Sequence, residues 1–208
     1  MRTETIDARA ARFWAGVTVL ASALVGGAGS APATAEDTPK TAREANGPFT
    51  LTSADIAEGR TIPDRQVFNS FGCKGANVSP ALSWRNPPAG TQSFALLVYD
   101  PDAPTGSGWW HWIVYDIPAS VTSLPAGAGE AGKHLLPAGA MQGRTDYGTV
   151  GYGGPCPPPG APHHYHFQLF ALKVAKLEVP KDATAALIGF NVHANSLGKA
   201  QIVALYGR

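Results

Sequence analysis

Short apolar runs separated by glycine- and proline-rich segments make up most of the sequence after its N-terminal part. The 208 residues include 24 glycines and 18 prolines. Glycine destabilises a helix through its backbone freedom, and proline removes a backbone donor and blocks the preceding turn. Short apolar runs between frequent turn residues are typical of all-β or β-dominated domains rather than of helical bundles.

Five of these apolar runs have the length of β-strands. The predicted strands are residues 48–56, 93–100, 109–117, 163–174 and 200–207. The second and third are apolar on both faces, as inner strands of a sandwich are. Residues 182–190 are the best helix candidate, because alanine dominates them and Asp182 can cap them. Residues 118–150 show no regular pattern. We therefore expect one antiparallel β-sandwich with one or two short peripheral helices.

The N-terminus has the pattern of a secretory signal peptide. Three arginines (Arg2, Arg9 and Arg12) precede an apolar run over residues 13–29, and the small residues Ala-Thr-Ala follow at 33–35. A basic region, an apolar region and a small-x-small site together predict cleavage after export. An uncleaved membrane anchor is the alternative.

This pattern sets the expected domain boundaries and location. Residues 1–35 are predicted to be the signal peptide, and the polar residues 36–46 a disordered lead-in. The remaining residues, 47–208, are enough for one domain with its own core. The mature protein is then expected to be periplasmic or secreted.

The sequence contains two cysteines, Cys73 and Cys156. An even count in an exported chain favours a disulfide between them. Two buried free thiols are the alternative.

The strand at 163–174 begins with three histidines within four residues. Because side chains alternate in a strand, His163 and Tyr165 share one face, while His164 and His166 share the other. The first face becomes apolar deeper in the strand. His163 with Tyr165 is therefore expected at the entrance of a pocket that opens on the core.

A further histidine, His111, lies in an unusually apolar strand, "WWHWIV". Burying an imidazole without a hydrogen-bond partner costs a few kcal/mol. Asp100 and Asp102 end the preceding strand and are the expected partners. The alternative is a core histidine with a purely structural role, whose ring nitrogens find hydrogen-bond partners within the protein.

The segment "PCPPPGAP" at 155–162 precedes the histidine strand. Successive prolines fix φ without regular hydrogen bonding, so the segment is predicted to form a rigid pocket wall. A purely structural polyproline turn is the alternative.

The residue types around these histidines favour an anion site over metal or nucleophile chemistry. There is no HExxH or CxxC pattern, so no metal and no cofactor are predicted. No serine has the spacing of a hydrolase nucleophile, and a disulfide would consume Cys156. Histidine and tyrosine can both donate hydrogen bonds to an anion. The net charge of +1 gives no general attraction to nucleic acid.

Three segments strongly resemble the phosphatidylethanolamine-binding protein family, in its bacterial Raf-kinase-inhibitor-like group of YbhB/YbcL type. They are "GCKGANVSPALSW" at 72–84, "YDPDAPTGSGWWHWIVYDIP" at 99–118 and "GYGGPCPPPGAPHHYHFQLFAL" at 151–172. The resemblance covers about residues 48–208. It implies an all-β dominated fold, an antiparallel Greek-key β-sandwich, with a small anion pocket at one end.

The resemblance also implies which residues form that pocket. The ligand-binding residues would be Asp100, His111, His163 and Tyr165, with Pro104 and Trp109 shaping the rim. The pocket of the family binds phosphate, acetate or phospholipid headgroups. Residues 118–150 differ from the eukaryotic members, which argues against kinase-type partners.

The function expected from these features is that of an exported, non-enzymatic binding protein. Its partner would be a small anion or phospholipid headgroup, or a phosphorylated or acidic group of another protein that it regulates. The alternative is an inhibitor of proteases or other enzymes that acts through surface loops. A hydrolase would need a nucleophile that the sequence does not offer.

Overall fold

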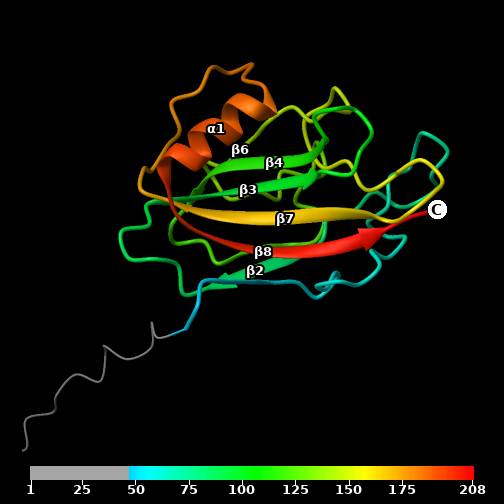
Figure 1. Ribbon diagram of the computed structural model, residues 1–208. Coiled ribbons are helices and arrows are strands. Elements are labelled where there is room, and N and C mark those ends of the chain that lie inside the picture. The colour runs from blue at the N-terminus through cyan, green and yellow to red at the C-terminus, as the bar shows by residue number, and fades with distance from the viewer. Residues whose placement is uncertain (1–46) are drawn as a thin grey trace, which may run out of the picture. The chain divides into compact units, whose positions relative to one another are not determined.

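The structure, a computed structural model, describes residues 47–208, which form two antiparallel sheets and one helix (Figure 1). The strands are β1 (Thr50–Thr52), β2 (Leu82–Arg85), β3 (Ser93–Asp100), β4 (Trp109–Pro118), β5 (Ser123–Leu124), β6 (Met141–Gln142), β7 (His163–Leu172) and β8 (Ser196–Tyr206), and the helix is α1 (Ala185–Asn195). The small sheet has the order β1-β2-β5, and the large sheet has the order β6-β4-β3-β7-β8. The predicted β-sandwich with a short helix is confirmed.

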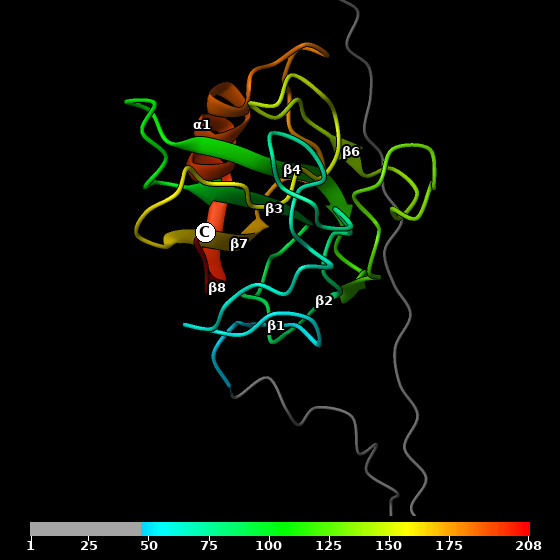
Figure 2. The same cartoon turned by 90° about the vertical axis from the view of Figure 1, so that its right-hand side faces the viewer.

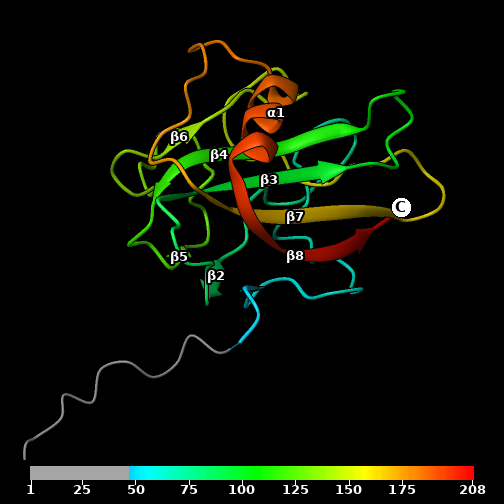
Figure 3. The same ribbon diagram turned by 60° about the vertical axis from the view of Figure 1, so that its left-hand side comes forward.

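The large sheet is apolar on both faces, which explains the continuous apolar runs of its central strands. One face of β3 carries Phe94, Leu96 and Val98 into the core between the two sheets. The other face carries Ala95 and Leu97 into a second core beneath α1. In Figures 1 and 3 the helix lies on one side of this sheet and β2 on the other. Both faces are therefore covered by protein.

The helix begins and ends later in the chain than predicted. Its N-cap is Thr184, whose hydroxyl accepts a hydrogen bond from the backbone N–H of Leu187 at 3.2 Å. The prediction that Asp182 caps a helix over residues 182–190 is wrong in both bounds. The helix continues to Asn195 because Ile188 and Val192 pack against the large sheet, a tertiary contact that outweighs the weak helix propensity of this segment.

Other elements also differ from the sequence prediction. The first strand is limited to Thr50–Thr52, where it pairs with β2. The last strand begins at Ser196 and pairs with β7 over nearly its whole length. Residues 118–150, predicted to be irregular, contain the two-residue strands β5 and β6. Pairing partners distant in the chain decide these cases, and local sequence does not reveal them.

The predicted signal peptide (1–35) and lead-in (36–46) lie outside the described residues. Within residues 47–208, no helix has the length and apolar character needed to cross a membrane.

Candidate functional site

Three neighbouring strands of the large sheet meet at one end of the sandwich. The strand β3 ends there at Asp100, while β4 begins at Trp109 and β7 begins at His163. Figure 2 shows this end, where β8 also reaches the C-terminus. Asp100 continues the alternation of Phe94, Leu96 and Val98, so its side chain lies on the face toward the small sheet.

A β-bulge brings His111 to the same face. In the pairing of β3 with β4, Val98 lies opposite Trp112 and Tyr99 opposite Trp110, so His111 is the extra residue. Simple alternation would place His111 and Trp112 on opposite faces. Instead, Trp112 packs in the core between the sheets, and the His111 ring lies 5.1 Å from that of Tyr165 in the same core. Bulges commonly reorient a side chain in this way beside functional sites.

The alternation predicted for β7 is confirmed. Tyr165 and Phe167 lie in the core between the sheets, whereas Phe170 and Leu172 lie beneath the helix. His163 is therefore on the side of Tyr165, and its side chain is only 13% exposed. His164 lies on the other side of the strand and is largely exposed.

The aspartates are paired with histidines other than His111. Nδ1 of His163 lies 2.7 Å from Oδ2 of Asp100, and Nδ1 of His164 lies 2.7 Å from Oδ2 of Asp102. The expectation that Asp100 or Asp102 bonds to His111 is wrong. His111 instead bonds to the carbonyl of Gly153, and Asp100 pairs with His163, the first residue of the other neighbouring strand.

The Asp102–His164 pair is a separate, exposed feature at the outer edge. Partial burial acts to raise the pKa of Asp102, but the hydrogen bonds from the side chain and backbone of His164 outweigh it and lower that pKa. The pair fixes the loop after β3 to the start of β7. Exposed pairs of this kind contribute little to stability.

His111 is bonded to a backbone carbonyl. Its Nδ1 lies 2.7 Å from the carbonyl oxygen of Gly153, and the Gly153 N–H donates back to the His111 carbonyl at 2.9 Å. Burial lowers the pKa of His111 to about 4, although the Gly153 carbonyl and Asp100 act in the opposite direction. The imidazole is therefore neutral at pH 7.

The glycines before the proline segment serve this arrangement. A Cβ on Gly153 would lie 2.3 Å from the ring of Tyr147, and one on Gly154 would lie 2.0 Å from the backbone oxygen of Gln66. Both glycines are therefore packed closely against protein groups.

A cavity of about 210 Å³ opens where these side chains meet. It is lined by Phe71, Asp100, Ala103, Pro104, Thr105, Trp109, His111, Tyr147, Cys156, Pro157, Pro158, His163 and Tyr165. All six residues predicted to bind a ligand are among them. The lining also includes Phe71 and Tyr147, which the sequence analysis missed. Phe71 lies in a loop, and Tyr147 lies in the stretch without regular pattern.

Three buried polar atoms near this cavity have no hydrogen-bond partner among the described residues. They are Nε2 of His111, the hydroxyl of Tyr165 and Nε1 of Trp109. Burial and the nearby Asp100 raise the pKa of Tyr165, so its hydroxyl keeps its proton and can donate. Buried polar groups are nearly always paired. Three unpaired ones around one cavity point to a polar ligand or ordered water there.

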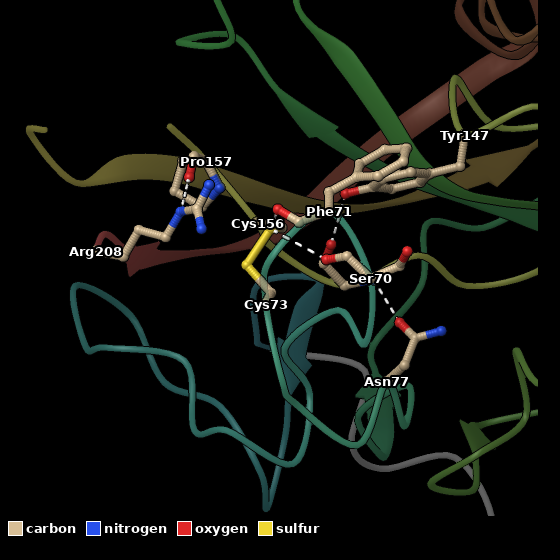
Figure 4. The surroundings of a disulfide bond; sticks show 9 residues. Ser70, Phe71, Cys73, Asn77, Tyr147, Cys156, Pro157 and Arg208 are labelled. Atoms are coloured by element: carbon tan, nitrogen blue, oxygen red, sulfur yellow. Dashed lines mark hydrogen bonds between the residues drawn. A yellow bond between two sulfur atoms is a disulfide. The ribbon is translucent and has the colours of Figure 1, made fainter. Parts of the chain in front are cut away.

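The wall formed by the proline segment is fastened at two points (Figure 4). Cys73 and Cys156 are joined by a disulfide, which ties this segment to the loop after Phe71. Arg208, at the end of the chain, donates from Nε to the carbonyl oxygen of Pro157 at 2.6 Å. The wall is thus held by a covalent link and a charge-assisted hydrogen bond.

A family model described as phosphatidylethanolamine-binding protein matches residues 52–207. The chain belongs to this family. The match includes every residue of the cavity.

Among the relatives, the phosphatidylethanolamine-binding protein family has two similar members in Escherichia coli. The chain is 51% identical to the UPF0098 protein YbcL over 159 residues, which are 76% of this chain and 87% of that protein. It is 48% identical to the UPF0098 protein YbhB over 156 residues, 75% and 98% of the two chains. The resemblance to this group is confirmed.

Solved structures of the family agree with the fold. The crystal structure of Escherichia coli YbcL has a TM-score of 0.75 at 50% identity and covers 77% of this chain and 98% of its own. A homologue from Chlamydia trachomatis has a TM-score of 0.64 at 31% identity, and the match covers 77% of this chain and 97% of that chain.

Among residues 47–208, no group of three or more histidine, cysteine or acidic side chains is placed to hold a metal ion.

Proposed function

We propose that this protein is a non-enzymatic binding protein that holds a small anion, such as phosphate or the phosphate of a phospholipid headgroup, in the cavity at the end of β3, β4 and β7. The observation that carries the proposal is the set of unpaired polar atoms of His111, Tyr165 and Trp109 around one cavity. A tetrahedral oxyanion offers several oxygens at once, so one ligand could satisfy all three groups.

The family supports the choice of ligand. Its description as phosphatidylethanolamine-binding indicates a ligand with a phosphate group. The aromatic side chains of Phe71, Trp109 and Tyr147 lie beside the polar groups and could contact the organic part of such a ligand. A mostly apolar pocket with a few convergent polar groups is typical of small-molecule sites.

Neither the cysteine nor the threonine along the cavity is an activated nucleophile, which supports a binding role. Cys156 is consumed by the disulfide, and the hydroxyl of Thr105 donates to the carbonyl oxygen of Gly108 at 2.5 Å. Nucleophilic catalysis needs a nucleophile within hydrogen-bond reach of a base. Neither group meets this requirement in the described part of the chain.

We further propose that the protein is exported and acts in the periplasm or outside the cell. The basic, apolar and small-residue pattern of residues 1–35 supports this location. The disulfide between Cys73 and Cys156 is also consistent with an oxidising compartment. If the bound anion belongs to a partner protein, binding would regulate that partner in the same compartment.

The test is calorimetric titration of the wild type with inorganic phosphate. His111→Ala and His163→Ala should each weaken binding at least tenfold, because a charge-assisted hydrogen bond contributes roughly 1.5 to 3 kcal/mol and 1.4 kcal/mol is tenfold. His164→Ala is the matched control, since this exposed neighbour lies on the other face of β7. Equal losses from His163→Ala and His164→Ala would contradict the proposal.

A further inference from the structure

The hydrogen bonding of His111 determines which of its ring nitrogens carries the proton. A carbonyl oxygen can only accept, so Nδ1 must donate to Gly153, 2.7 Å away. The reciprocal bond from the Gly153 N–H to the His111 carbonyl holds the two residues together. In the neutral ring, Nε2 therefore carries a lone pair and no hydrogen. This atom is buried and has no partner among the described residues.

Charged and titratable groups approach His111 from three elements. Asp100 comes from β3, His163 and Tyr165 from β7, and Asp146 and Tyr147 from the loop after β6. Nε2 of His111 has no hydrogen-bond partner among the described residues, so none of these groups supplies a hydrogen to it.

All of these groups except Tyr165 have hydrogen-bond partners within the protein. The carboxylate of Asp100 accepts from His163 and from the Asp102 N–H, at 2.7 and 2.9 Å. Asp146 accepts from the Trp110 N–H at 2.7 Å, and the Tyr147 hydroxyl donates to the Gly154 carbonyl at 2.8 Å. The carboxylates are thus not bonded to His111, and burial keeps its ring neutral at pH 7.

A lone pair at Nε2 is unsuited to an anion that has no hydrogen of its own. An oxygen of such an anion and Nε2 of His111 would both be acceptors, so their lone pairs would repel and no hydrogen bond would form. A ligand with an acidic hydroxyl, by contrast, can donate to Nε2 and accept from Tyr165 and Trp109. The cavity therefore combines one acceptor with two donors.

From this we infer, resting on the proposed function, that the cavity takes up its anion together with one proton shared between Nε2 of His111 and a ligand oxygen. The preferred ligand class is then the monoprotonated phosphate monoester, or inorganic phosphate in the same state. A phosphodiester or sulfate has no such hydrogen, so the ring itself must be protonated to receive it. With a pKa of about 4 this costs about a thousandfold in affinity at pH 7.

The experiment is calorimetric titration at pH 5 and pH 8, each in two buffers of different ionisation enthalpy, which counts the protons taken up. The probes are phosphorylethanolamine, a monoester, and glycerophosphorylethanolamine, a diester. The second ionisation of a phosphate monoester lies near pH 6. The monoester should therefore take up about one proton at pH 8 and about none at pH 5. The diester should take up about one at both, and bind more weakly.

Two variants locate the proton. His111→Gln places an amide donor near the same position, so proton uptake with the monoester at pH 8 should disappear. His164→Gln makes the same change on the exposed side of β7 and should retain it. If His111→Gln does not fold, the ¹⁵N resonance of His111 Nε2 in the wild type should move from its lone-pair position when phosphate is added at pH 7.

The outcomes separate this inference from the proposed function. Binding of the monoester at pH 8 without proton uptake would overturn the inference and leave the anion site intact. Uptake that persists in folded His111→Gln, or an unchanged Nε2 resonance on saturation, would also overturn it. If neither probe nor inorganic phosphate binds at any pH, the proposed function itself is wrong.

Discussion

Breaking the disulfide between Cys73 and Cys156 should strongly destabilise the domain. The link joins residues 83 apart in the sequence. In the chain-entropy model, closing a loop of this length restricts the unfolded chain by about 15 cal/mol/K, or about 4.5 kcal/mol at 25 °C. Unfolding entropy of about 2.1 cal/mol/K per residue gives about 0.34 kcal/mol/K for residues 47–208. The expected fall in Tm is therefore about 13 °C.

The assay is thermal unfolding followed by circular dichroism, with and without a reducing agent. Reduction breaks the link and leaves both sulfur atoms in place, so it separates the cross-link from side-chain packing. The double variant Cys73→Ser/Cys156→Ser should melt close to the reduced wild type and should not respond to the reductant. A fall in Tm below about 3 °C on full reduction would refute the reasoning.

Three further predictions concern stability. Thr184→Ala should lower the unfolding free energy measured in urea by about 1 kcal/mol, because the N-cap of α1 is lost, while Asp182→Ala should change it little. A larger loss from Asp182→Ala than from Thr184→Ala would show that the cap is misplaced. Gly154→Ala should destabilise the protein by at least about 2 kcal/mol, because the added Cβ would meet backbone atoms. Gly189→Ala in α1 should stabilise it by up to about 1 kcal/mol, because the added Cβ would lie 3.7 Å from the ring of Trp110; similar effects of the two variants would contradict the packing. His111 has a folded pKa of about 4, below the unfolded value of 6.5, so its contribution to the free energy of unfolding is present above pH 6.5 and is lost as the pH falls toward 4. Over this range the free energy of unfolding of the wild type should fall by about 3 kcal/mol more than that of folded His111→Gln, and parallel stability curves would contradict the burial of a neutral ring.

The central strands could be predicted from sequence because burial on both faces leaves a strong local signal. The segment 93–100 is strand throughout, and the alternation of His163 and His164 follows directly from strand geometry. The two-residue strands β5 and β6 could not be predicted, because their pairing partners β2 and β4 are distant in the chain. The end of the helix could not be predicted, because helix propensities do not include the packing of Val192 against the sheet.

The sequence predicted which residues line the candidate site, but it did not predict the hydrogen bonds between them. The motifs around Asp100, His111 and His163 supplied the right side chains for the cavity. The bulge at His111, however, depends on the register of β4 against β3, which no local pattern encodes. The bonds of His111 to the Gly153 carbonyl and of His163 to Asp100 also depend on tertiary contacts, so the partner predicted for His111 is wrong.

The central claim is that the cavity between β3, β4 and β7 binds an anion through the unpaired groups of His111 and Tyr165. The most direct test is a crystal structure at high resolution of the protein saturated with phosphate, as judged by calorimetry in solution. The account predicts one phosphate in the cavity, with oxygens 2.5–3.2 Å from Nε2 of His111 and from the hydroxyl of Tyr165. An empty cavity at saturation, or a phosphate held at another surface instead, would contradict it.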